Sequence, residues 1–267
     1  LGLLVRRVGR LYSDPRDDKR LGSVADLPRE PDVGTDAIFW ERELDGVHGA
    51  LTLGSVPRSH RVAADTHSVS IAVPGAGALA MSPERLVAAV AAFCARTTGT
   101  DDVVIGFPMM NRFGSPTANV ACTTVNVVPL RVAVSPAATA DDLAADAADG
   151  IRRIAPHARY RGEDIVRDAR RRGVDGVVGP TVNVKPFGST ISFGSLDATV
   201  RSLRRGPVVD LSITALDLGS GSRDHTDLEL TLDADTALYS RADVTRIAKS
   251  LASFVAALLD EPTRPVG

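Results

Sequence analysis

Hydrophobic residues along the chain follow two different periods, and each period marks one kind of secondary structure. Apolar residues three and four positions apart predict helices, and start and stop signals bound them. Helices are predicted at residues 1–12, 35–44, 82–98, 140–154, 162–172 and 240–259. Strict alternation of apolar and polar residues, or a short apolar run between turn signals, predicts a β-strand. Strands are predicted at residues 67–73, 102–107, 123–134, 181–184, 190–193, 209–216 and 227–232.

The segments between these elements indicate how the chain is organised. Ser82 followed by Pro83 is typical of a helix start, and Gly99 of a helix end. Residues 13–34 are rich in Asp, Arg, Gly and Pro and are expected to form a surface loop. Residues 46–58 contain glycines and are expected to connect two lobes. Because helices and strands are interleaved, the pattern indicates an α/β or α+β layered fold.

Composition narrows the function classes. The 267 residues suffice for one large domain or two modest ones, and 44% hydrophobic and 24% charged residues are typical of a globular protein. The net charge of −2 lacks the basic excess of a general nucleic-acid binder. The longest strongly apolar stretch, residues 86–95, has about half the length that a membrane-spanning helix needs. The two cysteines, Cys94 and Cys122, are too few for a disulfide framework or a structural zinc site. We therefore expect a cytoplasmic protein with no nucleic-acid partner, no membrane partner and no metal.

Two residue patterns carry possible chemistry, and each has a plain alternative. Eight arginines occur between residues 152 and 172, interleaved with acidic residues. We favour a solvated helix face with internal ion pairs over a docking surface for an acidic partner. Asn126 and Asn183 lie within apolar strands, where an amide must find partners. Composition leaves open whether they satisfy an irregular sheet edge or line a channel between lobes.

Five successive motifs resemble those of the condensation domains of nonribosomal peptide synthetases. Residues 102–112 (DVVIGFPMMNR) are similar to DVVxGxPxxGR, and residues 120–131 (VACTTVNVVPLR) to GxxVNxLPLR. Residues 157–164 (HARYRGED) resemble HQxYxxED, with an alanine in place of the glutamine. Residues 179–187 (GPTVNVKPF) and 206–212 (GPVVDLS) resemble FGPxxNxxPF, without its leading Phe, and GPVxDLS. The five motifs follow one another in the order and at about the spacing found in that family. Among its members, this sequence is most similar in character to siderophore-type modules such as enterobactin synthase.

The resemblance implies a fold and a reaction. The implied fold is the chloramphenicol-acetyltransferase-like α/β two-layer sandwich, built as two lobes. Residues 1–56 would form the end of the N-terminal lobe and a linker, and residues 57–267 the C-terminal lobe. The implied reaction joins a carrier-bound acyl or peptidyl thioester donor to a carrier-bound aminoacyl acceptor through an amide bond. Donor and acceptor carrier proteins would be the partners, and their phosphopantetheine arms would carry the substrates, with no cofactor bound directly.

The resemblance also assigns roles to residues. Residues 1–12 are similar to the helix that follows the family's catalytic His-His-x-x-x-Asp-Gly motif, so we expect the catalytic histidine upstream of Leu1 and an inactive isolated chain. Arg112, as ion-pair partner of that motif's aspartate, and Asn183, near the acceptor thioester, would support the active site. Residues expected at the tunnel or lobe interface are Asn126, Arg131 and Lys185. His157 and Tyr160 are expected to be structural.

Three alternatives stay open at this point. An epimerisation domain has the same fold and exchanges a substrate α-proton. A catalytically inactive relative binds carriers or partner enzymes without turnover. A free-standing acyltransferase that uses coenzyme A also shares the fold.

Overall fold

The computed structural model describes residues 2–27, 34–56, 65–77, 82–111, 116–185, 190–199, 206, 208–216 and 227–267. Its helices are α1 (Gly2–Ser13), α2 (Gly34–Glu43), α3 (Pro83–Thr98), α4 (Ala140–Ile154), α5 (Gly162–Arg171) and α6 (Arg241–Asp260). Its strands are β1 (Thr66–Gly77), β2 (Asp102–Met109), β3 (Asn126–Ala133), β4 (Thr181–Lys185), β5 (Thr190–Phe193), β6 (Leu196–Thr199), β7 (Leu211–Leu216) and β8 (Asp227–Asp235). Each predicted helix and strand is therefore confirmed, and of the α-helices and β-strands in the described ranges β6 is the one that was not predicted.

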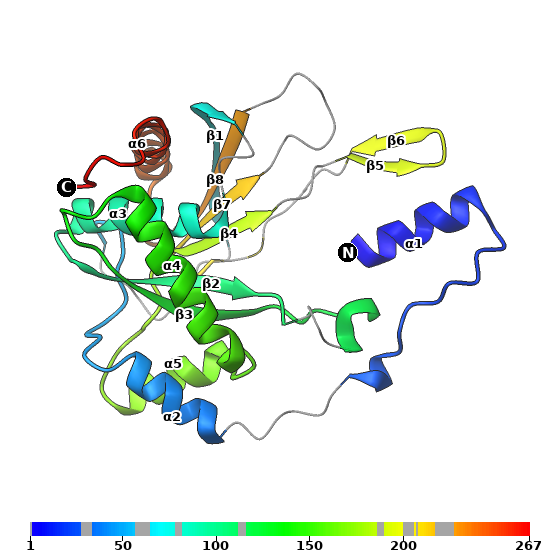
Figure 1. The fold of residues 1–267 in the computed structure, drawn as a ribbon, viewed down its shortest axis with the longest axis horizontal. Coiled ribbons are helices and arrows are strands. Elements are labelled where there is room, and N and C mark those ends of the chain that lie inside the picture. The colour runs from blue at the N-terminus through cyan, green and yellow to red at the C-terminus, as the bar shows by residue number, and fades with distance from the viewer. Residues whose placement is uncertain are drawn as a thin grey trace.

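The main sheet has six strands in the order β1-β8-β7-β4-β2-β3 (Figure 1). The pairs β7/β4 and β4/β2 are parallel, and the other neighbours are antiparallel. Strand β3 and the helices α4 and α5 lie between β2 and β4 in the sequence, and the β5–β6 hairpin lies between β4 and β7, so both parallel pairs are joined by long crossover connections. This mixed sheet places β4, with its Asn183, in the interior of the sheet.

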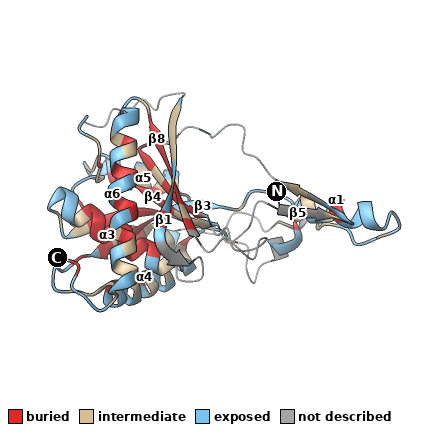
Figure 2. Cartoon of the chain, turned by 90° about the horizontal axis from the view of Figure 1, so that it is seen from above, coloured by how far each residue is buried: buried red, intermediate tan, exposed pale blue. Residues whose placement is uncertain are grey.

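Apolar and polar side chains alternate along the strands, so the main sheet has two different faces. We call the face covered by helices the helical face and the opposite one the open face. On β8 the side chains of Leu228, Leu230, Leu232 and Ala234 are buried in the hydrophobic core. Helices α3, α4 and α6 cover that face, and α6 packs along β1 and β8 (Figure 2). Since neighbouring residues on a strand point to opposite sides, the residues between these leucines point to the open face. One sheet layer and one helix layer confirm the predicted α/β two-layer sandwich.

A second, smaller group of elements stands apart from the main sheet. Helix α1 lies beside the β5–β6 hairpin (Figure 1), and the Tyr12 ring meets the edge of the Phe193 ring at a centroid distance of 6.3 Å. Figure 2 shows this group on the side of the open face. The open face of the main sheet therefore lies toward this smaller group of elements.

Candidate functional site

A row of four polar side chains crosses the open face. Strand register places Ser70 of β1 opposite Thr231 of β8, Thr231 opposite Thr214 of β7, and Thr214 beside Asn183 of β4. We call these four residues the polar row. The hydroxyls of Ser70 and Thr231 are 2.9 Å apart and share a hydrogen bond. Thr231 and Thr214 in the middle are buried, with 0% and 4% of their surface exposed, and Asn183 at the end is half-buried.

Two charged residues flank the polar row. Lys185 follows Asn183 by two positions on β4, so it shares the open face, and it is exposed. Glu229 lies two positions before Thr231, and its Oε1 is 3.5 Å from the Thr231 hydroxyl. Sequence reasoning missed Glu229, Thr231 and Thr214. The signal was present in the strict alternation of leucines with polar residues in DLELTLDAD, residues 227–235.

Asn126 anchors the segment of residues 157–162, which we call the 157–162 corner. Its Nδ2 donates to the carbonyls of Ala158 at 2.8 Å and Tyr160 at 2.7 Å, and its Oδ1 accepts from the Gly162 N–H at 3.0 Å. A Cβ on Gly162 would lie 2.2 Å from the Val127 carbonyl oxygen, so the start of α5 fits against β3 only with glycine there. The Asn126 amide is thus occupied by main-chain groups, which favours the sheet-edge alternative over a channel lining.

His157 attaches α2 to the same corner. Its Nδ1 lies 2.7 Å from Asp36 Oδ1, and its ring stacks on Phe39 at a centroid distance of 3.7 Å. The carbonyl of His157 accepts a hydrogen bond of 3.1 Å from the indole N–H of Trp40, which is buried. These contacts fit the structural role expected for His157.

The Tyr160 hydroxyl contributes a pH-dependent stability to the 157–162 corner. Its hydroxyl donates to Asp168, and burial together with this hydrogen bond raises its pKa from 10.0 to about 12. Because the folded state holds the phenolic proton more tightly than the unfolded state, the associated stability is complete below pH 10 and is lost as the pH rises toward about 12.

Tyr160→Phe is therefore expected to lower the free energy of unfolding by about 1 kcal/mol at pH 8. The difference from wild type should shrink steadily above pH 10. Urea unfolding curves recorded at several pH values between 8 and 11.5 measure it. If the free energies of unfolding of wild type and Tyr160→Phe differ by the same amount at every pH up to 11.5, the raised pKa of Tyr160 is contradicted.

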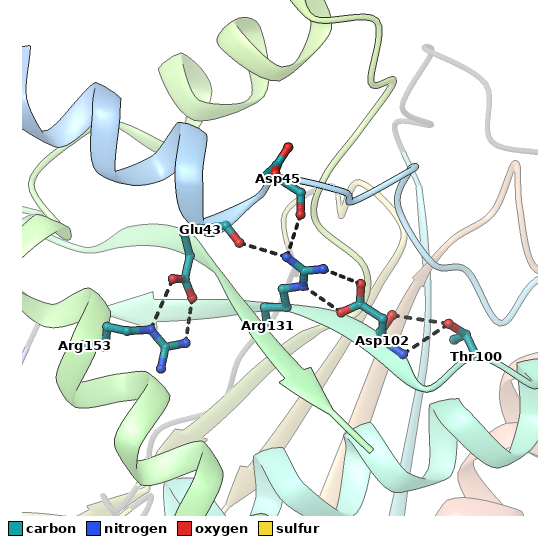
Figure 3. A network of polar contacts seen from close by, with 6 residues as sticks. All are labelled: Glu43, Asp45, Thr100, Asp102, Arg131 and Arg153. Carbon is teal, nitrogen blue, oxygen red and sulfur yellow. Dashed lines mark hydrogen bonds and ion pairs between the residues drawn. The ribbon is translucent and has the colours of Figure 1, made fainter. Parts of the chain in front are cut away.

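Arg131 binds the C-terminal end of α2 to β3 (Figure 3). Its Nε and Nη2 donate to the two carboxylate oxygens of Asp102, both at 2.8 Å, and its Nη1 donates to the carbonyls of Glu43 at 3.2 Å and Asp45 at 2.8 Å. The hydrogen bonds to Asp102 raise the pKa of the Arg131 guanidinium. Arg153 of α4 forms two more hydrogen bonds with the Glu43 carboxylate, at 2.7 and 3.1 Å. These contacts hold α2 against the main sheet unit.

The connector that follows α2 is fixed to the sheet as well. The Tyr239 hydroxyl donates to Asp210 at 2.6 Å, lies 2.9 Å from the Thr52 hydroxyl, and accepts from the Leu53 N–H at 3.2 Å. Burial, followed by the Asp210 carboxylate, raises the pKa of Tyr239 above the ordinary tyrosine range. Within the connector expected at 46–58, the part around Leu53 is thus bound to the main unit. A lobe boundary at residue 56 remains a prediction.

The arginine-rich segment fits the solvated-face interpretation. Its ion pairs include Arg152–Asp149, Arg153–Glu43, Arg167–Asp164, Arg170–Asp175, Arg171–Asp168 and Arg172–Glu41. Arg112 lies outside the described residues, so its expected role stays a prediction. Within the described ranges, no three His, Cys, Asp or Glu side chains group as metal ligands would. No described helix has the length and hydropathy needed to span a bilayer.

Comparison with known proteins adds independent information. The profile of the family described as "Condensation domain" matches residues 29–267. Isonitrile lipopeptide synthase of Streptomyces coeruleorubidus is 32% identical over 288 residues, which cover 100% of this chain and 19% of that protein. Dimodular nonribosomal peptide synthase of Bacillus subtilis (strain 168) is 36% identical over 162 residues, or 60% of this chain and 7% of that protein.

Solved structures are similar along nearly the whole chain. A variant of the starter condensation domain of rhizomide synthetase, in complex with C8-CoA and Leu-SNAC, superposes with a TM-score of 0.80 at 26% identity and covers 99% of this chain and 63% of that one. The first condensation domain of the calcium-dependent antibiotic synthetase, in complex with a substrate analogue, gives a TM-score of 0.77 at 25% identity over 99% of this chain and 62% of that one. The chain thus spans less than a fifth of these curated relatives and under two thirds of these structural relatives.

Proposed function

The chain belongs to the condensation-domain family, and from this premise we propose that it takes part in amide bond formation during nonribosomal peptide biosynthesis. The acceptor amine attacks the thioester carbon of the donor, the C–S bond breaks, and the thiol of the donor arm leaves with the proton that the amine loses. The observation that carries the proposal is the polar row on the open face, which ends at Asn183.

Asn183 is proposed to bind the developing oxyanion or the pantetheine arm. Its carboxamide donates hydrogen bonds without carrying charge, and a donor aimed at developing negative charge lowers the barrier most in a site that excludes water. The buried Thr214 and Thr231 behind it support such a setting. Thioester aminolysis is favourable, so holding the two substrates together supplies much of the acceleration. Proton removal by the histidine expected upstream of Leu1 would add about 10²–10⁴-fold.

Partners and organisation follow from the same proposal. Donor and acceptor carrier proteins would deliver the substrates on phosphopantetheine arms, and a relative solved with C8-CoA and Leu-SNAC supports a site that accepts thioesters. We propose residues 1–56 as the end of an N-terminal lobe with its linker, and residues 57–267 as the C-terminal lobe, in a cytoplasmic protein. Arg112 is proposed to support the catalytic loop, and Arg131 and Lys185 to lie at the tunnel or lobe interface.

The test is an amide-formation assay with loaded donor and acceptor carriers. The protein in its full natural length is expected to form the amide product detected by mass spectrometry, and the 267-residue chain alone is expected to stay at background. Solvent deuterium incorporated at the acceptor α-carbon without amide would favour the epimerisation domain. Carrier binding without any product would favour the inactive binding relative and overturn the proposed reaction.

A further inference from the structure

Glu229 carries a carboxylate on the open face that finds little to bind within the described part of the chain. The side chain is half-buried, and its polar contact there is the Thr231 hydroxyl at 3.5 Å. Hydrogen bonds between hydroxyl and carboxylate oxygens are normally about 2.5–3.0 Å long, so this one is weak. Among the described residues, Glu229 forms no ion pair with a cation. A half-buried charge without a close partner is costly, and this one calls for an explanation.

Other carboxylates at the same two strands have short hydrogen bonds. Asp210, directly before β7, accepts from the Tyr239 hydroxyl at 2.6 Å. Asp235, at the end of β8, accepts from the Ala237 N–H at 2.7 Å. Both aspartates are buried and stabilise the fold. Glu229 differs from them because its carboxylate is accessible and is left for a group from outside.

Strand register places Glu229 beside the polar row. Thr231 of the row lies two positions further along β8, and Asn183 lies two strands away at the end of the row. With strands about 4.8 Å apart and a rise of about 3.3 Å per residue, the Cα atoms of Asn183 and Glu229 are about 12 Å apart. Ala72, which pairs with Glu229 on β1, has a methyl side chain and is exposed. The carboxylate is therefore open to a ligand that lies along the face.

The distance between the two side chains suggests what such a ligand is. Side chains stand roughly perpendicular to a sheet, so the polar ends of Asn183 and Glu229 keep about the spacing of their Cα atoms. One hydrogen bond of about 2.9 Å at each end leaves roughly 6 Å for the ligand itself. The long stem of a lysine or arginine side chain, which carries a cation at its end, spans a gap of this size.

We infer that Glu229 selects a substrate with a cationic side chain, either an ammonium or a guanidinium, whose thioester lies at Asn183. The inference rests on the proposed function, in which Asn183 binds at the reacting thioester. A carboxylate binds such cations through charge-assisted hydrogen bonds, which are about twice as strong as neutral ones. Glu229 touches the substrate side chain and no reacting atom. The cationic side chain can come from the acceptor or from an aminoacyl donor.

Arginyl and citrullyl thioesters test the inference, because their side chains have nearly the same shape and differ in charge. With the full-length wild type, kcat/KM for the arginyl acceptor should exceed that for the citrullyl acceptor about tenfold or more, the equivalent of one charge-assisted hydrogen bond. In Glu229→Gln the two values should agree within about twofold. The same comparison with N-acetylarginyl and N-acetylcitrullyl donors shows which substrate carries the cation. Equal values in wild type for both acceptors and both donors would overturn the inference.

Glu84→Gln is the matched control. Glu84 is also a half-buried glutamate, but it lies on α3, which covers the helical face on the other side of the sheet (Figure 2). This variant should keep the wild-type preference for arginine. Glu229→Gln should keep the wild-type melting temperature, because it breaks no ion pair among the described residues. A preference that persists in folded Glu229→Gln, or that is lost equally in Glu84→Gln, would contradict the role of Glu229.

A binding measurement keeps the inference testable if wild type forms no amide, an outcome that would defeat the proposed function alone. The probes are amide analogues of arginyl-pantetheine and citrullyl-pantetheine, in which nitrogen replaces the thioester sulfur. Titration calorimetry should give a Kd about tenfold lower for the arginyl analogue with wild type, and equal Kd values with Glu229→Gln. Equal wild-type affinities, or no binding of either analogue, would overturn the inference whatever the reaction turns out to be.

Discussion

Asn183→Ala is expected to lower kcat for amide formation about a hundredfold, which is the loss seen when one oxyanion donor is removed. The position supports an effect of this size because Asn183 is the one carboxamide of the polar row and stands beside the buried Thr214. If the interaction forms only in the transition state, kcat and kcat/KM fall together and KM stays constant. Steady-state rates with soluble acyl and aminoacyl thioesters measure the change.

Two further variants control this result. Asn183→Asp has the same shape without the donor, so it should lose activity as Asn183→Ala does and should not rescue it. Asn119→Ala removes an exposed carboxamide at another place and should leave the rate unchanged. A rate for Asn183→Ala within about threefold of wild type would remove Asn183 from the reaction and leave it a structural role in the sheet.

Arg131→Ala is expected to destabilise the fold by about 2–3 kcal/mol. The substitution removes two charge-assisted hydrogen bonds to Asp102 and two bonds to carbonyls at the end of α2. Breaking a fully buried pair costs about 3–5 kcal/mol, and the 30% exposure of the Arg131 side chain reduces that figure through solvent screening. Urea unfolding followed by the fluorescence of Trp40, the single tryptophan, reports both global unfolding and release of α2.

Arg153→Ala is the matched control for this prediction. Arg153 also binds a carboxylate with two hydrogen bonds, but its side chain is 49% exposed, and it binds no carbonyl of the described residues. Its loss should cost about 0.5–1 kcal/mol. Arg131→Lys should not restore stability, because an ammonium lacks the planar fork that reaches Asp102 and the two carbonyls together. Equal costs for the two alanine variants would contradict the capping role of Arg131.

Much of the secondary structure could be predicted because its causes are local. Ser82 accepts a hydrogen bond from the Arg85 N–H, and Gly99 ends α3 with a φ of 75°, as the sequence signals indicate. Strand ends were less certain. The predicted strand 227–232 extends to Asp235, because Asp233 and Asp235 continue the alternation and are buried, and the turn begins only at Asp235 itself, whose carboxylate accepts from the Ala237 N–H at 2.7 Å.

The attachment of α2 could not be predicted from sequence. The segment shows a short helix with Phe39 and Trp40, but its partner His157 lies 117 residues beyond Trp40. Nothing in either segment specifies the other, since the stacking and the indole hydrogen bond arise only when the fold brings both to one place. The same holds for Arg131, whose guanidinium reaches carbonyls 86 and 88 residues earlier in the chain.

The sequence by itself determined the elements and the family, because periodicity, capping residues and motif order are properties of neighbouring residues. It also marked Asn183 and Asn126 as amides within apolar strands. Only the tertiary structure decided that the Asn126 amide is occupied by the 157–162 corner, while Asn183 ends a row of hydroxyls on the open face. The physical reason is strand register: the polar row joins residues of four strands, and their alignment is fixed by long-range pairing and core packing.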